Sequence, residues 1–252
     1  MKIHAIPFII LFSSVNLFAQ GGPPMLTDDS GTPGDGNWEN NLATVYQGSK
    51  SDYSIALPVF DLNYGVGERI QLNLEAAWTS GRGQPLAKTF DNISPGMKYR
   101  FFDEEKQGLS VSTYPHVLFS FNPSDTTKSL EYGFILPLAA SKEVFSIDWN
   151  LQIGYQLLGN ESEIFYGLVV GKEIFPSFLF MAELHEAFDR KISGSQENEI
   201  FLRAGSFINL GTQWAVSKTF TILAAFGKDT DPNISGPGES RFYGYFGLQV
   251  HQ

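Results

Sequence analysis

VFSIDWNLQIGYQLLG, residues 144–159, alternates large apolar residues with polar residues or glycine from Phe145 onward. Successive side chains of a β-strand point to opposite faces of the sheet, so this period of two predicts a strand with one apolar and one polar face. A half-buried strand of a soluble protein shows such a pattern over about five or six residues. A strand that crosses a bilayer at a tilt needs roughly 9–11 residues. The length of the alternation therefore favours a membrane-spanning strand.

The composition of the whole chain agrees with this interpretation. Of its 252 residues, 42% are hydrophobic and 14% are aromatic, and the mean hydropathy is −0.10. This value excludes a bundle of transmembrane helices, but it suits a transmembrane barrel because half of each strand faces a polar interior. The absence of cysteine excludes a fold held together by disulfides. A formal net charge of −10 without any basic run gives no support to nucleic-acid binding.

The first residues, MKIHAIPFIILFSSVNLFA, have the form of a secretory signal peptide. Lys2 supplies a positive charge, an apolar stretch interrupted by Pro7 follows, and Ala19 is a small residue suited to cleavage. The apolar stretch is shorter than the ~20 residues that a spanning helix needs. We therefore predict that residues 1–19 are removed on export and that the protein resides in the periplasm, the outer membrane or outside the cell.

The rest of the chain divides into an N-terminal arm and a β domain. Residues 20–36 are rich in Gly, Pro and Asp, which predicts either an ordered arm or a flexible lead-in. Residues 37–252 are predicted to form an all-β domain, a transmembrane antiparallel up-and-down β-barrel of twelve strands. The predicted strands are 37–47, 53–64, 68–79, 93–102, 109–121, 129–140, 144–158, 163–174, 177–187, 197–209, 213–226 and 240–250.

The connections between the predicted strands carry a second signal. Short turns follow every second strand, for example at residues 65–67, 141–143 and 210–212, and most of the other connections are longer. An outer-membrane barrel has this arrangement, with the short turns and both termini in the periplasm. In the second strand the apolar residues change phase, and a bulge near Pro58 would restore the alternation.

The polar faces of the predicted strands carry many ionisable side chains. Buried in the core of a soluble sandwich, unpaired charges would each cost several kcal/mol, whereas a hydrated or hydrogen-bonded barrel interior can hold them. Only a closed barrel in lipid gives every strand one polar and one apolar environment without an open edge. The residues predicted to line the lumen are Glu75, Lys98, Arg100, Glu131, Asp148, Asn150, Gln152, Lys172, Glu183, His185 and Arg203.

Few residues suggest catalysis or metal binding. His116 and His185 are predicted to face inward and could pair with Ser120 or Glu183, as in lipid-hydrolysing barrels, but a lumen histidine in a polar network is the favoured interpretation. The acidic residues of the arm, Asp28, Asp29 and Asp35, resemble a loose set of oxygen ligands for calcium. They lack the spacing of an EF-hand, which favours a solvated acidic segment. We therefore expect no cofactor and no metal.

Three segments of the N-terminal half resemble a known family. PPMLTDDSGTPGDGNWE, residues 23–39, resembles the opening of the outer-membrane "transporter" family of the meta-pathway of phenol degradation. LNYGV at residues 62–66, followed by IQL at 70–72, is similar to a second block of that family, and PGMKYRF at 95–101 is similar to its Gly-x-Lys-Tyr-Arg-Phe segment. The resemblance implies an outer-membrane barrel that takes up aromatic or other small hydrophobic compounds.

These observations together predict a non-enzymatic barrel in the outer membrane of a Gram-negative bacterium. The expected function is passive passage of small, aromatic or hydrophobic molecules, and the expected partners are outer-membrane lipid, the barrel assembly machinery and the solute. A barrel with a plugged interior, either structural or acting as an enzyme on lipids, is the alternative. A soluble secreted β-sandwich or lectin is the third interpretation.

Overall fold

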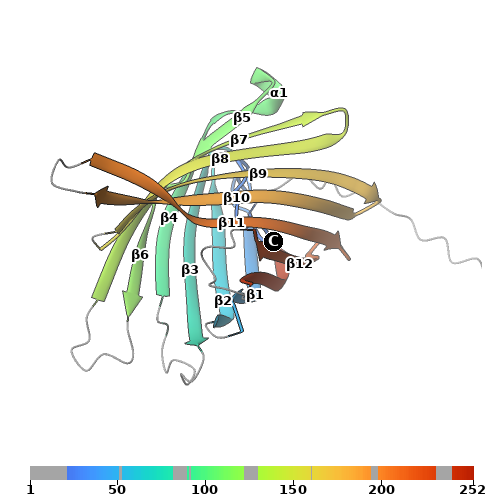
Figure 1. Ribbon diagram of the computed structural model, residues 1–252. Helices are drawn as coiled ribbons and strands as arrows, with labels where there is room; N and C mark the ends of the chain where they lie inside the picture. The colour runs from blue at the N-terminus through green and yellow to red at the C-terminus, as the bar shows by residue number, and fades with distance from the viewer. Residues whose placement is uncertain are drawn as a thin grey trace, which may run out of the picture.

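The computed structural model describes residues 22–50, 53–81, 90, 92–121, 130–159, 161–193, 198–230 and 240–252. Its strands form one antiparallel sheet that closes into a barrel, because β1 pairs with β13 and β3 pairs with β4 (Figure 1). The predicted signal peptide lies outside the described residues. The strands are β1 Trp38–Gly48, β2 Tyr53–Val66, β3 Ile70–Gly81, β4 Asn92–Phe102, β5 Ser110–Thr113, β6 His116–Phe121, β7 Leu130–Val144, β8 Ile147–Leu158, β9 Glu161–Phe175, β10 Phe178–Ser193, β11 Asn198–Ala215, β12 Phe220–Asp229 and β13 Phe242–His251.

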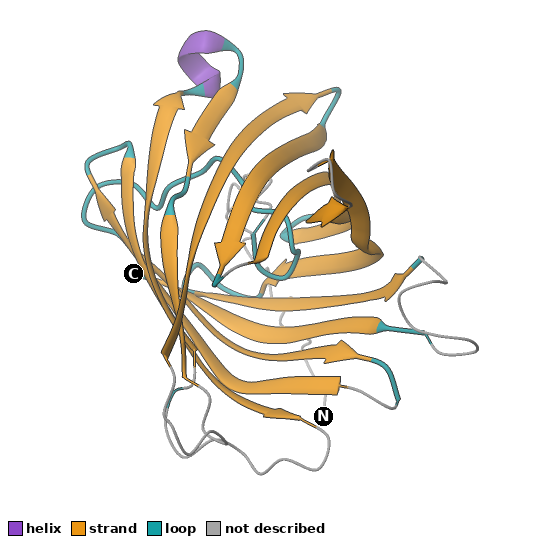
Figure 2. Ribbon diagram, turned by 60° about the vertical axis from the view of Figure 1, so that its left-hand side comes forward, coloured by secondary structure: helices purple, strands orange, loops and turns teal. Residues whose placement is uncertain are grey.

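The barrel has twelve strand positions, as predicted, because β5 and β6 share one position between β4 and β7. Strands make up nearly the whole wall, with one short helix at an end of the barrel (Figure 2). The predicted strand 109–121 is interrupted at Tyr114 and Pro115, since proline has no backbone N–H for the ladder. Local hydrogen bonds bridge the interruption: the Met97 N–H donates to the Pro115 carbonyl, and the Tyr114 N–H donates to the Pro137 carbonyl. The wall of the barrel therefore stays continuous at this point.

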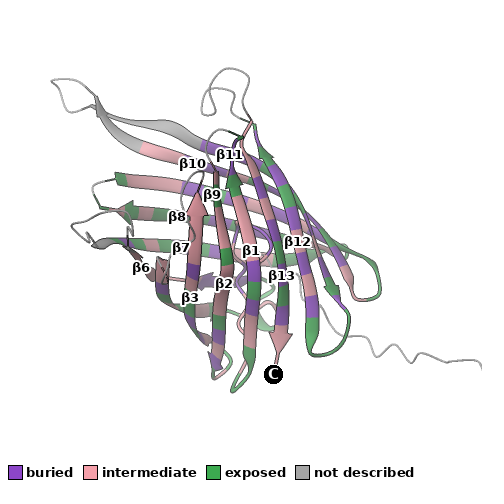
Figure 3. Cartoon of the chain, turned by 90° about the horizontal axis from the view of Figure 1, so that it is seen from below, coloured by how far each residue is buried: buried purple, intermediate pink, exposed green. Residues whose placement is uncertain are grey.

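Burial alternates along the strands, so that one face of the sheet points into the barrel and the other points outward (Figure 3). In β8 the outward Leu151 and Ile153 are 55% and 54% exposed, whereas the inward Asn150 and Gln152 are each 1% exposed. The apolar face therefore points out of the cylinder, which is the arrangement of a barrel in lipid and the reverse of a soluble protein. The predicted fold class is confirmed.

Two predicted turns are wrong. The turn between β7 and β8 is formed by Phe145 and Ser146, whose φ angles are 55° and 56°, and residues 141–143 belong to β7. A two-residue hairpin loop requires positive φ, which overrides the apolar alternation that begins at Phe145. Residues 210–212 lie inside β11, where glycine at position 211 allows close approach of another segment instead of marking a turn.

The predicted bulge in the second strand is confirmed. The registers of β2 with β1 and with β3 both shift around Ala56 and Val59, which flank Pro58. The shift turns Asp61 and Asn63 onto the inward face. The connection from β4 to β5 contains the short helix α1, Glu104–Gln107, which is closed by Gly108 in a left-handed conformation. Among the described residues, no helix is long and apolar enough to cross a bilayer.

Candidate functional site

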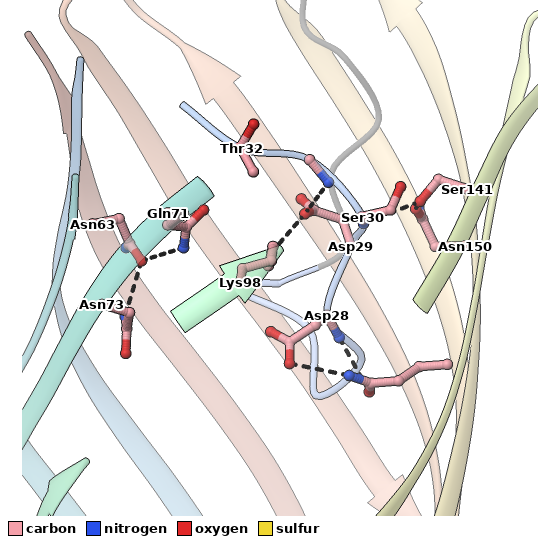
Figure 4. A network of polar contacts seen from close by, with 12 residues as sticks. Asp28, Asp29, Ser30, Thr32, Asn63, Gln71, Asn73, Lys98, Ser141 and Asn150 are labelled. Atoms are coloured by element: carbon pink, nitrogen blue, oxygen red, sulfur yellow. Dashed lines mark hydrogen bonds and ion pairs between the residues drawn. The ribbon is translucent and has the colours of Figure 1, made fainter. Parts of the chain in front are cut away.

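The arm, defined here as residues 22–36, lies inside the barrel before the chain enters β1 (Figure 4). Thr27 is fully buried, Ser30 is 1% exposed and Asp29 is 7% exposed. A segment without regular secondary structure can be buried only if the surrounding wall satisfies its backbone N–H and C=O groups. The expectation of a solvated acidic segment is therefore wrong for Asp29.

Glu183 of β10 binds the backbone of the arm. Its carboxylate accepts hydrogen bonds from the N–H of Thr27 at 2.7 Å and the N–H of Leu26 at 3.2 Å. The side-chain amide of Asn209 in β11 donates to the same carboxylate at 2.5 Å. Hydrogen bonds to a charged group contribute about 1.5–3 kcal/mol each. Glu183 is thus a main anchor of the arm on the wall.

Two further inward side chains hold the next residues of the arm. Gln152 of β8 accepts a hydrogen bond from the N–H of Asp28 at 3.3 Å and donates one to the Asp28 carboxylate at 3.0 Å. The N–H of Ser30 donates to the hydroxyl of Ser141 in β7 at 3.2 Å, and that hydroxyl in turn donates to Asn150. Inward side chains of the wall therefore hydrogen-bond successive residues of the arm.

Lys98 of β4 holds the arm from the other side of the barrel. Its Nζ lies 3.0 Å from Oδ1 of Asp29, and the two side chains are only 7% and 10% exposed. The ammonium also lies 5.4 Å from the ring centre of Tyr114, within range of a cation–π contact. Since an isolated buried charge is costly, each partner depends on the other.

Glycines in the wall make room for the arm. A Cβ at position 167 would lie 1.9 Å from the Thr27 hydroxyl oxygen, and a Cβ at position 211 would lie 2.6 Å from the terminal methyl of Met25. Near the end of the arm, a Cβ at position 65 would lie 1.8 Å from the carbonyl oxygen of Gly34. Positions 65 and 167 therefore accept only glycine while the arm keeps its place, whereas at position 211 the flexible end of the Met25 side chain would have to shift.

A cavity of about 520 Å³ lies between the arm and one side of the wall, formed mainly by β1 to β4 and completed by residues of β6, β7 and β13. Along β1 its lining reaches from Glu39 to Gln47, which corresponds to about 26 Å of extended chain. That distance covers most of the strand. The cavity is therefore elongated along the barrel wall.

The lining of the cavity changes along its length. At one end it is formed by Gln47, Ser54 and Thr79, and the next level is apolar, with Val45, Ala56, Val59 and Ala77. Asp61 and Glu75, which are directly paired neighbours on β2 and β3, form an acidic level below it. Towards the other end the lining is mostly carboxamide, and includes Asn41, Asn63, Asn73 and Gln71.

The carboxamides are organised around Asp61. Its carboxylate accepts hydrogen bonds from the side-chain amides of Asn41 at 2.8 Å, Asn63 at 3.0 Å and Asn73 at 2.6 Å. Asn63 also accepts a hydrogen bond from Gln71 at 2.5 Å (Figure 4). Neutral amides orient the Asp61 carboxylate but leave its negative charge in place.

The structure distributes the predicted lumen residues over several environments. Glu75 and Lys98 line the cavity, and Asn150, Gln152 and Glu183 serve the bound arm. His185 stacks on Phe165, Asp148 lies at the start of β8, and Arg100 binds the Glu68 carbonyl and Asp103 at the end of the barrel. The side chains of Glu131 and Arg203 lie outside the described ones. Lys172 is misplaced in the prediction: its inward neighbours are Val169 and Gly171, so it takes an outward position next to the β9–β10 turn.

Several functional residues were missed by the sequence pattern. Asp61 and Asn63 lie where the apolar residues of the second strand change phase, and the predicted bulge at Pro58 was the signal that would have placed them inward. The binding of Asp28 and Asp29 to the lumen wall has no comparable local signal, because their partners lie far away in the sequence.

The residues considered for catalysis or metal binding do not converge. His116 Nδ1 lies 3.0 Å from the carbonyl oxygen of Tyr114, His185 stacks on Phe165, and Glu183 is engaged by the arm. Asp35 accepts a hydrogen bond from the N–H of Gly67. Among the described residues, no group of three or more His, Asp or Glu side chains is placed to hold a metal ion.

Solved structures with the same fold are outer-membrane barrels. No protein-family model matches the chain, and no curated protein matches it in sequence. The NanC porin aligns over 84% of this chain and 98% of its own, with a TM-score of 0.55 and 10% identity. The COG4313 outer membrane channel from Pseudomonas putida F1 aligns over 86% and 95%, with a TM-score of 0.55 and 10% identity. The KdgM porin, solved in complex with disordered oligogalacturonate, aligns over 84% and 98%, with a TM-score of 0.53 and 9% identity. At these identities the similarity establishes the fold alone.

Proposed function

We propose that this chain is an outer-membrane channel in which small solutes pass between the arm and the wall formed by β1 to β4. The elongated cavity of about 520 Å³ is the observation that carries this proposal. The fold supports it, because a closed barrel lets strands cross lipid without unpaired edges while keeping a polar interior. The arm narrows the lumen, so the route suits small molecules only.

The position of the protein in the cell follows from the same proposal. Residues 1–19 direct export, the barrel assembly machinery inserts the chain, and both ends of the barrel domain face the periplasm. The outward side chains support a lipid environment: Leu136 is 46% exposed, Ile208 52% and Leu210 51%. In water such an apolar surface would favour aggregation.

The solutes are small molecules with an apolar part, in line with the resemblance to the phenol-degradation transporters. Val45, Ala56, Val59 and Ala77 give the cavity an apolar level that an aromatic ring or alkyl chain can contact. Polar residues on both sides of this level keep the rest of the route hydrated. Such a lining lets a partly apolar molecule pass without binding tightly.

Conductance of the purified full-length chain in planar bilayers tests the proposal. The informative variant is Ala77→Trp, which places a large ring in the cavity, and the matched control is Ala76→Trp, on the outward face of the same strand. We expect wild type and the control to conduct and Ala77→Trp to lose most of the current. Equal currents in all three proteins would show that ions do not follow this cavity.

A plugged structural barrel is the second candidate function, because the arm is held by a buried ion pair and by Glu183. Deletion of residues 23–33 separates the two functions. A channel conducts with the arm in place and conducts more without it. A plugged barrel is silent until the arm is deleted.

A further inference from the structure

The charge of the cavity is unbalanced. Asp28, Asp61 and Glu75 line it, and no cationic side chain pairs with any of them among the residues that the structure describes. Of the described lining residues, Lys98 is the only lysine or arginine, and its charge is already matched by Asp29. The route therefore keeps a net negative charge.

Glu75 and Asn41 both have polar atoms without a partner. Within the described part of the chain, Glu75 has no hydrogen-bond or ion-pair partner, and its side chain is exposed although it points into the barrel. Asn41 is only 3% exposed, lines the cavity and donates to Asp61, but its Oδ1 accepts no hydrogen bond within the described structure. Buried polar atoms are usually satisfied, so an unsatisfied acceptor beside the Asp61 carboxylate indicates a place for a donor group.

The acidic level lies directly beside the apolar level. Val59 precedes Asp61 by two residues on β2, and Glu75 precedes Ala77 by two residues on β3, so the two kinds of surface are about 7 Å apart. Tyr245 lines the cavity at the height of Val45 and so adds to the apolar level. One small molecule can contact both levels at the same time.

From these observations we infer that the channel selects small organic cations, amines with an apolar body. The ammonium group donates hydrogen bonds to Asp61, Glu75 and the free Oδ1 of Asn41, while the apolar body lies against Val59 and Ala77. The excess negative charge raises the local concentration of cations and excludes anions of the same size. This inference rests on the proposed channel function and names its substrate class.

Reversal potentials in planar bilayers test the inference with the full-length chain. A potassium chloride gradient measures cation over anion selectivity. Bi-ionic conditions then compare benzylammonium with potassium, and benzoate with chloride, so that the two organic probes share a ring and differ in charge. We expect potassium to be favoured over chloride severalfold, benzylammonium to permeate at least as well as potassium, and benzoate to be excluded.

Two variants connect the selectivity to the acidic level. The double substitution Asp61→Asn with Glu75→Gln keeps the shapes and removes both charges of the acidic level, so the preference for cations should fall clearly below the wild-type value, and Asp28 accounts for the part that remains. Asp148→Asn removes a carboxylate that lies outside the cavity lining, and the selectivity should stay at the wild-type value.

The outcomes separate the inference from the function on which it rests. A barrel that conducts without cation preference, or that passes benzoate as well as benzylammonium, overturns the inference and leaves the channel intact. Unchanged selectivity in the double variant also overturns it. A barrel that never conducts overturns the channel function, and the inference with it.

Discussion

Two walls of the same barrel use their inward polar residues in different ways. In the arm-binding wall, β8 to β11, the inward Asn150, Gln152 and Glu183 are almost completely buried and hydrogen-bond the arm or the residues that hold it. In the cavity wall, β1 to β4, Asp61 is bound by amides of its own wall and Glu75 is exposed to the lumen. The first wall holds the arm from several strands, whereas the second touches it at Lys98 and near its end and otherwise faces the cavity.

The difference shows that an alternating strand specifies a polar interior but not its occupant. Both walls have the same period of two, and both have carboxylates and carboxamides on the inward face. The arm decides which of these groups become buried. Glycines at positions 167 and 211 let the arm approach the first wall closely, and the cavity remains on the opposite side.

Lys98→Met should have the largest effect on how tightly the arm is held, because Lys98 of the cavity wall forms an ion pair with the arm. The substitution leaves the Asp29 carboxylate buried without its partner at 3.0 Å. Breaking one side of a buried ion pair costs about 3–5 kcal/mol. We expect the arm to leave the wall and its backbone amides, those of Thr27 and Ser30 among them, to lose protection in hydrogen exchange.

Removal of both charges provides the control for this variant. The double variant Lys98→Met with Asp29→Asn contains no uncompensated charge, so it should recover most of the lost protection. If Lys98→Met keeps the exchange rates of the wild type, the ion pair does not hold the arm.

The alternation in the sequence was sufficient to predict the barrel but not its contents. The strand number, the inward direction of Asn150 and Gln152, and the bulge at Pro58 follow from local periodicity, since side-chain direction in a strand depends only on position. The turn at Phe145 and Ser146 was missed because a tight hairpin can place apolar residues at positive φ.

The position of the arm could not be read from the sequence for a different physical reason. Its residues have no periodicity, and its stability depends on partners more than a hundred positions away, such as Gln152 for Asp28 and Glu183 for Thr27. Gly211 was mistaken for a turn residue, although glycine inside a strand also marks close approach of another segment. The identity of that segment appears only in three dimensions.

Arginine substitutions on the outward face should show that the two walls differ only inside. Leu151→Arg lies on the arm-binding wall and Leu74→Arg on the cavity wall, at positions that are 55% and 42% exposed. Each should destabilise the barrel in lipid by about 2–4 kcal/mol, because both place a charge in hydrocarbon. Urea unfolding in vesicles, followed by heat-modifiable migration on gels, measures the effect, and Leu151→Met is the control. A neutral result at either position would contradict a lipid-facing wall there.

Gly167→Ala should weaken the arm-binding wall alone. The new methyl group would lie 1.9 Å from the Thr27 hydroxyl oxygen, so either the arm or the strand must move. Overpacking of this kind costs about 1–3 kcal/mol. The control is Gly205→Ala in β11, where the nearest atom would lie at 3.5 Å, an ordinary contact. We expect faster proteolysis of the arm in the first variant only, and equal rates would show that the arm adapts to the extra methyl group.

The smallest effect should come from replacing one asparagine in each wall. Asn209→Ala removes a fully buried amide that donates to Glu183, and it leaves part of that carboxylate unsatisfied, which costs about 1–3 kcal/mol. Asn73→Ala removes a donor to Asp61, but Asp61 keeps Asn41 and Asn63, and water in the cavity can replace the third bond. We therefore expect only about 0.5–1 kcal/mol at position 73. Urea unfolding in vesicles gives both free energies of unfolding. A larger loss of stability at position 73 than at position 209 would mean that water reaches the Asp61 carboxylate less easily than the Glu183 carboxylate.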